Sequence, residues 1–96
     1  MVIAQISIAP VGKEVDLSEY VKEAIKIFKK YNVPYAINDM STIVETEDID
    51  TLFSLVKDAH NAVFKKDVKR VITEIKIDDR KDKIVRLGEK SASIID

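Results

Sequence analysis

The sequence predicts a small α+β domain in which two helices cover one face of a four-stranded antiparallel sheet. Residues 2–9 and 70–78 alternate apolar and polar side chains, as strands with one buried face do. Between them lie two amphipathic helical patterns, separated by a short stretch rich in turn residues that fits a hairpin. The order strand, helix, strand, strand, helix, strand is typical of the ferredoxin-like α+β sandwich.

The first strand is expected over residues 2–9. One of its faces carries only apolar side chains, from Val2, Ala4, Ile6 and Ile8. The first helix is expected to begin after Asp16, which together with Glu19 resembles a capping box. Its apolar residues, Val21 among them, recur every three or four positions as far as Tyr31, and Pro34 then prevents a further turn.

Residues 35–38 and 42–45 are two short strand candidates, joined by the polar turn Asn-Asp-Met-Ser. A second helix is expected to begin near Asp48. Its apolar stripe includes Phe53 and ends at Val63.

The last strand alternates again over residues 70–78, and a charged loop and a short C-terminal helix follow it. No repeat or linker interrupts the chain, so residues 1–96 are expected to form a single domain. The sheet face without helices would carry Ile3, Gln5, Ser7, Ile72, Glu74 and Lys76. This mixture is either a half-exposed sheet with two stray isoleucines or, as we expect, a surface for self-association.

The composition argues against several partners. The 96 residues carry 16 basic and 17 acidic side chains, a balance that gives no attraction for nucleic acid or anionic lipid. The predicted central strands also lack the aromatic side chains on which RNA-recognition modules stack bases. The opening residues do not resemble a secretion signal and no apolar run reaches the roughly 20 residues of a membrane span, so a cytoplasmic location is expected.

The sequence also lacks catalytic and metal-binding patterns. It has no cysteine and one histidine, His60, which lies beside the apolar stripe of the second helix and is expected to be a boundary side chain. Ser41 and Thr42 have no candidate base in a recognisable motif, and no glycine-rich phosphate loop is present. The run DDRKDK at 78–83 invites a metal site, but its alternating charges favour solvated ion pairs. We expect no catalytic residue, no metal and no cofactor.

Three segments resemble the thiamine-binding protein family, the YkoF-like group of small ferredoxin-fold proteins. They are the opening strand AQISIAPVG, the hairpin YAINDMSTIVETED and the closing strand KRVITEIKIDDR with the EK that follows it. The resemblance covers nearly the whole chain. It implies non-catalytic binding of thiamine, or of its hydroxymethylpyrimidine moiety, by a homotetramer built as a dimer of dimers. The chain departs from the family pattern at Thr46, where Gly is common, and at Asp39 and Met40, where the turn often has Pro or Gly.

The resemblance points to Tyr35, Thr42 and Glu45, and to Ser7 on the first strand, as ligand-binding residues. A carboxylate such as Glu45 can accept from the exocyclic amine of the pyrimidine, and the Thr42 hydroxyl can satisfy a ring nitrogen. Met40 or Tyr35 can cover a ring face. Because a three-residue offset places Thr42 and Glu45 on opposite faces of a regular strand, both reach one ligand only if the hairpin bulges or a second subunit supplies one wall.

The alternative is that the hairpin is only structural. Thr42 would then be a strand former and Glu45 a strand-end acid. The domain would act as a regulatory or scaffolding oligomerisation module through its sheet, with no small ligand.

Overall fold

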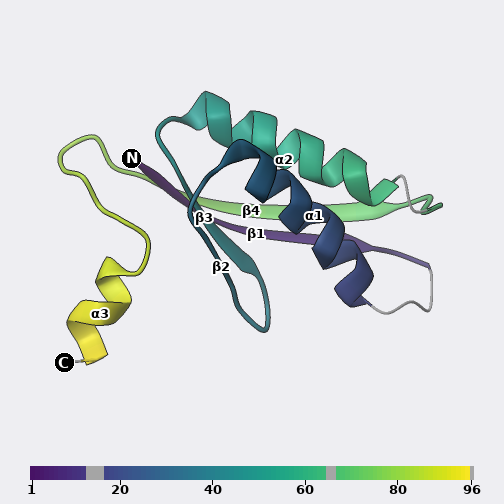
Figure 1. Ribbon diagram of the computed structural model, residues 1–96, viewed down its shortest axis with the longest axis horizontal. Coiled ribbons are helices and arrows are strands. Elements are labelled where there is room, and N and C mark those ends of the chain that lie inside the picture. The colour runs from purple at the N-terminus through teal and green to yellow at the C-terminus, as the bar shows by residue number, and fades with distance from the viewer. Residues whose placement is uncertain (13–16, 65–66, 96) are drawn as a thin grey trace.

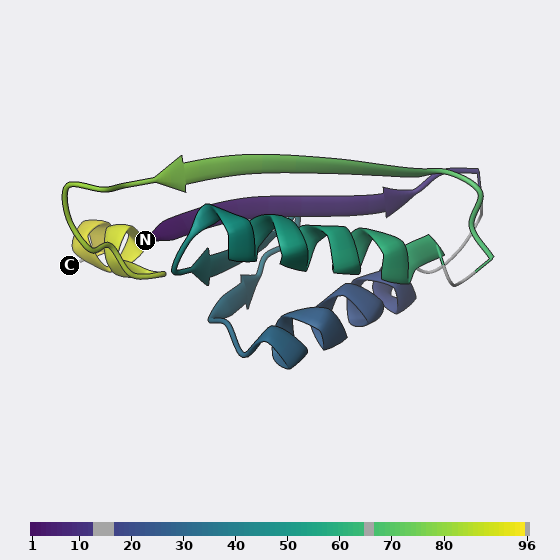
Figure 2. The ribbon, with the colours of Figure 1, turned by 90° about the horizontal axis from the view of Figure 1, so that it is seen from above.

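The computed structural model describes residues 1–12, 17–64 and 67–95. Its elements follow the predicted order, and a short helix ends the chain (Figure 1). They are β1 (Val2–Pro10), α1 (Leu17–Tyr31), β2 (Tyr35–Ile37), β3 (Thr42–Thr46), α2 (Ile49–Phe64), β4 (Val71–Asp79) and α3 (Glu89–Ile95). The strands form one antiparallel sheet in the order β2-β3-β1-β4. Helices α1 and α2 lie together on one side of β1 and β4 (Figure 2), which confirms the ferredoxin-like α+β fold.

Strand β1 has two neighbours of different reach. It pairs with β4 along its whole length, from Val2 opposite Asp79 to Pro10 opposite Val71. Its pairing with β3 ends at Ile6, opposite Thr42. Residues 7–10 of β1 therefore continue beyond the start of β3, and the sheet has a notch beside them.

The core lies between the sheet and the two helices. The alternation predicted for β1 is confirmed, because Val2, Ala4 and Ile6 are at most 2% exposed. From the helices, Phe28 and Leu55 fill the space above them and are also almost fully buried. Each such apolar side chain contributes about 1.5–3 kcal/mol when it is removed from water, and these residues are the main source of the domain's stability.

Local signals determine where the helices begin and end. Helix α1 ends at Tyr31, and Asn32 follows it with a φ of 56°, the left-handed conformation common after a helix C-terminus. Helix α2 starts at Ile49, directly after Asp48 as predicted, and the Asp48 carboxylate accepts a hydrogen bond from the Thr51 N–H at 2.7 Å. The predicted cap at Asp16 lies outside the described residues.

The prediction that Phe53 belongs to the core stripe of α2 was wrong, because its side chain is 52% exposed. The buried residues of α2 are Leu52, Leu55, Val56, Ala59, Ala62 and Val63, and Phe53 lies to one side of this stripe. His60 is seven positions further on, on the same side of the helix, and its Nδ1 lies 2.6 Å from Thr73 Oγ1 on β4. This contact confirms His60 as a boundary residue and places its side of α2 over β4.

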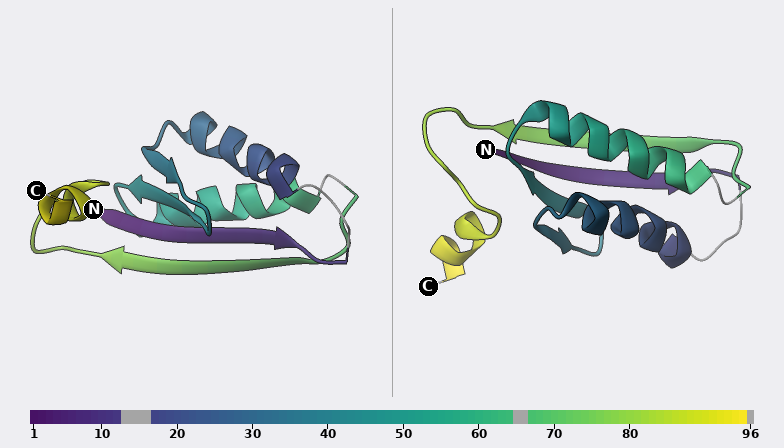
Figure 3. Two further views of the ribbon diagram at one scale, coloured as in Figure 1. Left: turned by 90° about the horizontal axis from the view of Figure 1, so that it is seen from below. Right: turned by 45° about the horizontal axis from the view of Figure 1, so that its top comes forward.

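Helix α3 lies beyond the end of the sheet, near the start of β1 (Figure 3). Residues 88–94 are all exposed. No helix in the described ranges is long and apolar enough to span a membrane.

Candidate functional site

The β2–β3 hairpin has a tight, polar tip. The Asn38 N–H donates to the Ser41 carbonyl at 2.8 Å, and Ile37 pairs with Thr42 at the base of the turn. Asp39 and Met40 form the tip itself, where Met40 is 86% exposed. An apolar side chain this exposed is available to cover a ligand or a second protein surface.

A hollow of about 220 Å³ lies between this turn and the notch in β1. Its walls are residues 6–9 of β1, Val21 of α1 and residues 37–42 of the hairpin, and we call it the hairpin pocket. It exists because β1 continues past its last β3 partner, which leaves the turn standing beside residues 7–9. Three of the predicted ligand residues meet here, namely Ser7, Met40 and Thr42.

The hairpin pocket combines apolar walls with hydrogen-bonding groups. Ser41 and Thr42 bring hydroxyls to its lining, and Thr42 is only 9% exposed. Ser7 lines it from β1, but its side chain alternates with Ile6 and lies on the face without helices. Among the described residues, no strand pairs with residues 7–9 on the side away from β4. Backbone groups alternate sides along a strand, and the Val11 N–H bonds to the Arg70 carbonyl, so within this stretch Ile8 is the residue whose N–H and C=O point away from β4.

An apolar groove adjoins the hairpin pocket. It runs between α1 and β2, has a volume of about 440 Å³, and shares Val21 and Ile37 with the pocket. Ile25 forms its floor with them, and its rim carries Lys22, Lys26 and Lys29. The Lys26 ammonium forms an ion pair with Glu23 at 3.1 Å. The two hollows together offer room for a flat ring and a substituent, with positive charge along the outer side.

Glu45 does not lie in the hairpin pocket. It pairs with Ile3, whereas Thr42 pairs with Ile6 on the helix-covered face, so the opposite-face geometry predicted for Thr42 and Glu45 is present. The β3 register runs without a bulge from Thr42 to Thr46. Within one chain, therefore, the two side chains do not reach the same ligand.

The Glu45 carboxylate is held by the C-terminal arm, the segment of residues 80–95. Its Oε2 accepts from Arg86 Nη1 at 3.0 Å, and its Oε1 accepts from the Leu87 N–H at 2.8 Å. Glu45 is 4% exposed although it lies on the face without helices, because the arm covers it. A carboxylate that is buried and bonded in this way can receive a ligand only after the arm moves.

Tyr35 also lies outside the hairpin pocket. It pairs with Val44, on the helix-covered face of the sheet, and its ring packs against Phe28 with 6.1 Å between the ring centroids. Its role in the described structure is to attach the short strand β2 to α1.

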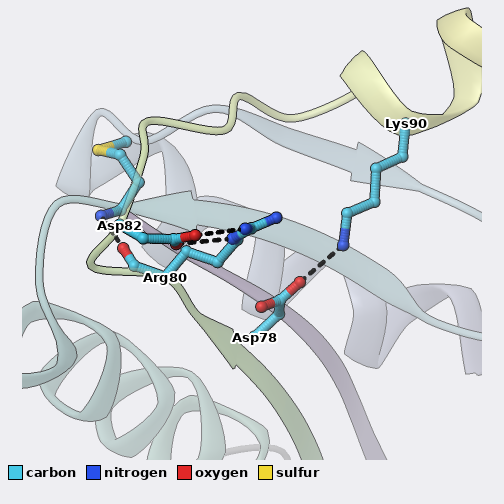
Figure 4. Close-up of polar contacts among 5 residues, drawn as sticks. Asp78, Arg80, Asp82 and Lys90 are labelled. Carbon is cyan, nitrogen blue, oxygen red and sulfur yellow. Dashed lines mark hydrogen bonds and ion pairs between the residues drawn. The ribbon is translucent and has the colours of Figure 1, made fainter.

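Charged side chains form a corner where β4 enters the arm (Figure 4). Lys90 Nζ donates to Asp78 Oδ2 at 2.7 Å, and Arg80 donates to both carboxylate oxygens of Asp82 at 2.9 and 2.6 Å. These pairs confirm the prediction of ion pairs for residues 78–83. The hydrogen bond from Arg80 lowers the pKa of Asp82 to about 2, and that from Lys90 lowers the pKa of Asp78. Within the described ranges, no cluster of three or more acidic or histidine side chains could hold a metal ion.

Two features of the site were missed in the sequence. Arg86 and Leu87 lie 41 and 42 positions from Glu45, too far along the chain for any local pattern to connect them. Val21 was predicted as part of a core stripe, but it is 37% exposed and lines both the pocket and the groove. The sequence signal for this exposure was the position of Val21 at the side of the apolar stripe.

The family model described as "Thiamine-binding protein" matches residues 4–95. The chain therefore belongs to the thiamine-binding protein family. The UPF0045 protein MJ1052 of Methanocaldococcus jannaschii is 46% identical over 93 residues, which cover 97% of this chain and 91% of that protein. The UPF0045 protein YqgV of Bacillus subtilis is 37% identical over 99 residues, covering 98% of this chain and 94% of that protein.

Solved structures of similar proteins share the fold. The crystal structure of MJ1052 has a TM-score of 0.86 at 43% identity, covering 97% of this chain and 94% of that one. A Thermotoga maritima protein, provisionally named a thiamine biosynthesis/salvage protein, has a TM-score of 0.80 at 22% identity, with 97% of each chain covered. At that identity the second comparison supports the fold of this thiamine-binding family member and not its ligand.

Replacing Glu45 by Ala should release the C-terminal arm. Hydrogen bonds to a charged group contribute about 1.5–3 kcal/mol, but Arg86 is 58% exposed and its share is small. We expect the free energy of unfolding to fall by about 2 kcal/mol, chiefly through the lost Leu87 N–H bond. Trypsin should then cleave at Arg86 and Lys90 faster under native conditions. The exposed neighbour Glu47→Ala is the control, and unchanged cleavage in Glu45→Ala would show that Glu45 does not hold the arm.

Replacing Lys90 by Met should raise the pKa of Asp78 toward its ordinary value of 3.8, because the Lys90 hydrogen bond is the main cause of its lowering. Since the folded-state pKa is lowered, the charged pair stabilises the docked arm above about pH 4 and is lost as the pH falls through the folded-state pKa. Carboxyl NMR titration measures the shift. The pKa of Asp82, held at about 2 by Arg80, is the internal reference and should stay constant. An Asp78 pKa that does not move in Lys90→Met would contradict this assignment.

Proposed function

We propose that this chain binds thiamine, or its hydroxymethylpyrimidine moiety, in the hairpin pocket and does not catalyse its conversion. Membership of the thiamine-binding protein family supports the class of ligand. The observation that carries the choice of site is the notch in β1, which leaves the Ile8 N–H and C=O without a strand partner beside the hollow that Thr42 also lines.

The chemistry of the aminopyrimidine suits this arrangement. Its exocyclic amine donates hydrogen bonds and its ring nitrogens accept them, so that one edge of the ring resembles the edge of a peptide. A strand edge offers the complementary alternation of acceptors and donors. Thr42 supplies a hydroxyl that can serve in either role, Ser7 lines the pocket from β1, and the exposed thioether of Met40 can fold over the ring face.

The size of the hollow favours one ring in the pocket and the rest of the ligand outside it. Its volume of about 220 Å³ is below the 300–1,000 Å³ of most small-molecule sites. In our proposal the remainder of the molecule lies along the adjoining groove over Val21 and Ile37. The lysines on the rim of this groove favour a phosphate ester over the bare thiazolium cation, so a thiamine phosphate should bind at least as tightly as thiamine.

Tyr35 and Glu45 have supporting parts in this proposal. Tyr35 holds β2 against α1 and so fixes one wall of the pocket. Glu45 reaches a ligand only where the arm has released it, since Arg86 and Leu87 occupy its oxygens. The residues proposed to touch the pyrimidine are therefore Ser7, Met40 and Thr42.

We further propose that the chain works as a homo-oligomer, a dimer of dimers. The sheet face without helices carries Ile43 and Ile72, and Ile72 is 45% exposed. The arm contacts this face at the end of the sheet where Glu45 and Asp78 lie. The remaining surface is apolar enough to favour burial against a second copy, and two-fold symmetry is the usual arrangement of such a contact.

Calorimetric titration with thiamine, hydroxymethylpyrimidine and thiamine phosphate tests the ligand proposal. Loss of one buried hydrogen-bonding partner costs about 1–3 kcal/mol, so Thr42→Val should weaken binding by about tenfold or more. Glu45→Ala is the control, because it leaves the hairpin pocket intact. A larger effect in Glu45→Ala than in Thr42→Val would place the ligand under the arm instead. If no compound binds below millimolar concentration, the domain is a scaffolding module rather than a thiamine-binding one.

Light scattering tests the oligomer proposal. Ile43→Lys introduces a charge in the middle of the open face and should reduce the particle mass to half that of the unaltered protein. Ile43 lies on β3, so the change leaves β4 untouched. The control is Ile84→Lys, at a side chain that is 68% exposed in the arm. A mass of 10.9 kDa for the unaltered protein at micromolar concentration would refute the proposal.

A further inference from the structure

The hairpin pocket contains one charged side chain. Of the described residues that line it, Asp39 alone is ionisable. Asp39 is exposed at the tip of the turn, and within the described part of the chain its carboxylate has no hydrogen-bond or ion-pair partner. The turn is closed by the hydrogen bond from the Asn38 N–H to the Ser41 carbonyl at 2.8 Å, which holds Asp39 beside the pocket. The carboxylate is therefore available to a donor on a ligand.

The groove that adjoins the pocket carries charge of the opposite sign. Its described ionisable side chains are all lysines, at positions 22, 26 and 29. Lys26 is paired with Glu23, whereas Lys22 and Lys29 have no such partner among the described residues. The pocket and the groove share two apolar walls, so together they form one hollow with a negative end and a positive side.

The exocyclic amine of the aminopyrimidine has two N–H donors, and the pocket offers two acceptors for them. The Ile8 carbonyl has no strand partner on the β1 wall, and Asp39 lines the pocket from the turn. One N–H can donate to each, while the ring nitrogen beside the amine accepts from the Ile8 N–H. A hydrogen bond to an ionised acceptor is about twice as strong as one to a neutral acceptor.

We propose that Asp39 is the specificity-determining residue of the hairpin pocket. Its carboxylate accepts a hydrogen bond from the exocyclic amine, and its negative charge excludes a phosphate group from the pocket. The ligand is thereby oriented with its amine at the turn and its phosphate along the lysines of the groove. This inference rests on the proposed function, because it concerns the same ligand in the same pocket.

The alternative is that Asp39 serves only the shape of the turn. Asp and Asn are both favoured in tight turns, for the same reason of backbone conformation and local hydrogen bonding. Asp39→Asn therefore removes the charge while keeping the size of the side chain and its suitability for the turn. A purely structural Asp39 would leave ligand preference unchanged in this variant.

Calorimetric titration with two pyrimidines tests the recognition of the amine. One is hydroxymethylpyrimidine, and the other is its analogue with an oxo group in place of the amine. In the unaltered protein the carboxylate faces an acceptor in the analogue, so the amino compound should bind about tenfold more tightly or better. In Asp39→Asn the amide can donate to the oxo group, and this preference should fall by about fivefold. An unchanged preference would overturn the proposal.

The sign of the effect on thiamine phosphate tests the orientation. With the amine at Asp39, Asp39→Asn should weaken binding by about fivefold, less than for a buried pair because the turn is open to water. With the phosphate in the pocket instead, loss of the like charge would tighten binding, and this result would overturn the proposal. Glu47→Gln is the matched control, since it removes the same charge from an exposed residue beyond the far end of β3 and should leave both measurements unchanged.

Thr42→Val separates this inference from the proposed function. If Thr42→Val weakens binding and Asp39→Asn does not change the preference for the amine, the pocket binds the pyrimidine without Asp39, and only the role of Asp39 is wrong. If no compound binds the unaltered protein below millimolar concentration, the proposed function and the role of Asp39 are both wrong.

Discussion

The structure depends on β1 and on the unequal reach of its two neighbours. Strand β4 accompanies β1 over nine residue pairs, whereas β3 accompanies it over five. The longer ladder holds the first and last strands together under α2 and produces a long outer edge. The shorter ladder ends at Ile6 and leaves the notch that the hairpin turn converts into a pocket. The candidate pocket therefore follows from the length of β1 relative to the strand beside it.

The sequence predicted the elements well because their signals are local. Alternation in β1 and β4, Pro34 after the first helix, and Asp48 before the second all act within a few residues. The errors concern residues at the sides of the apolar stripes of the two helices. Phe53 and Val21 have the spacing of core residues, but how far a helix covers its sheet is determined by packing, which no single segment encodes. The two side chains ended exposed beside the edge strand and the pocket, respectively.

The candidate site was only partly accessible from the sequence. Ser7 and Thr42 meet because β1 and β3 pair with Ile6 opposite Thr42, a register that hydrophobic alternation constrains. Glu45 is different. Its partners are a backbone N–H and a half-exposed guanidinium in a charged tail, and neither has a sequence signature. In the sequence, an acidic residue at a strand end looks the same whether its carboxylate binds a ligand or another part of its own chain.

The β1–β4 ladder also has a consequence for how the chain acquires its structure. It joins residues as far apart as Val2 and Asp79, close to the two ends of the sequence. Loop closure over such a separation must precede any gain from the ladder, and chains rich in distant contacts fold more slowly than those rich in local ones. During synthesis on the ribosome, the edge of β1 that pairs with β4 stays unpaired until β4 has emerged, which requires most of the chain. The strand that completes the fold is thus the last to arrive, and until then the apolar underside of α2 is exposed to other nascent chains.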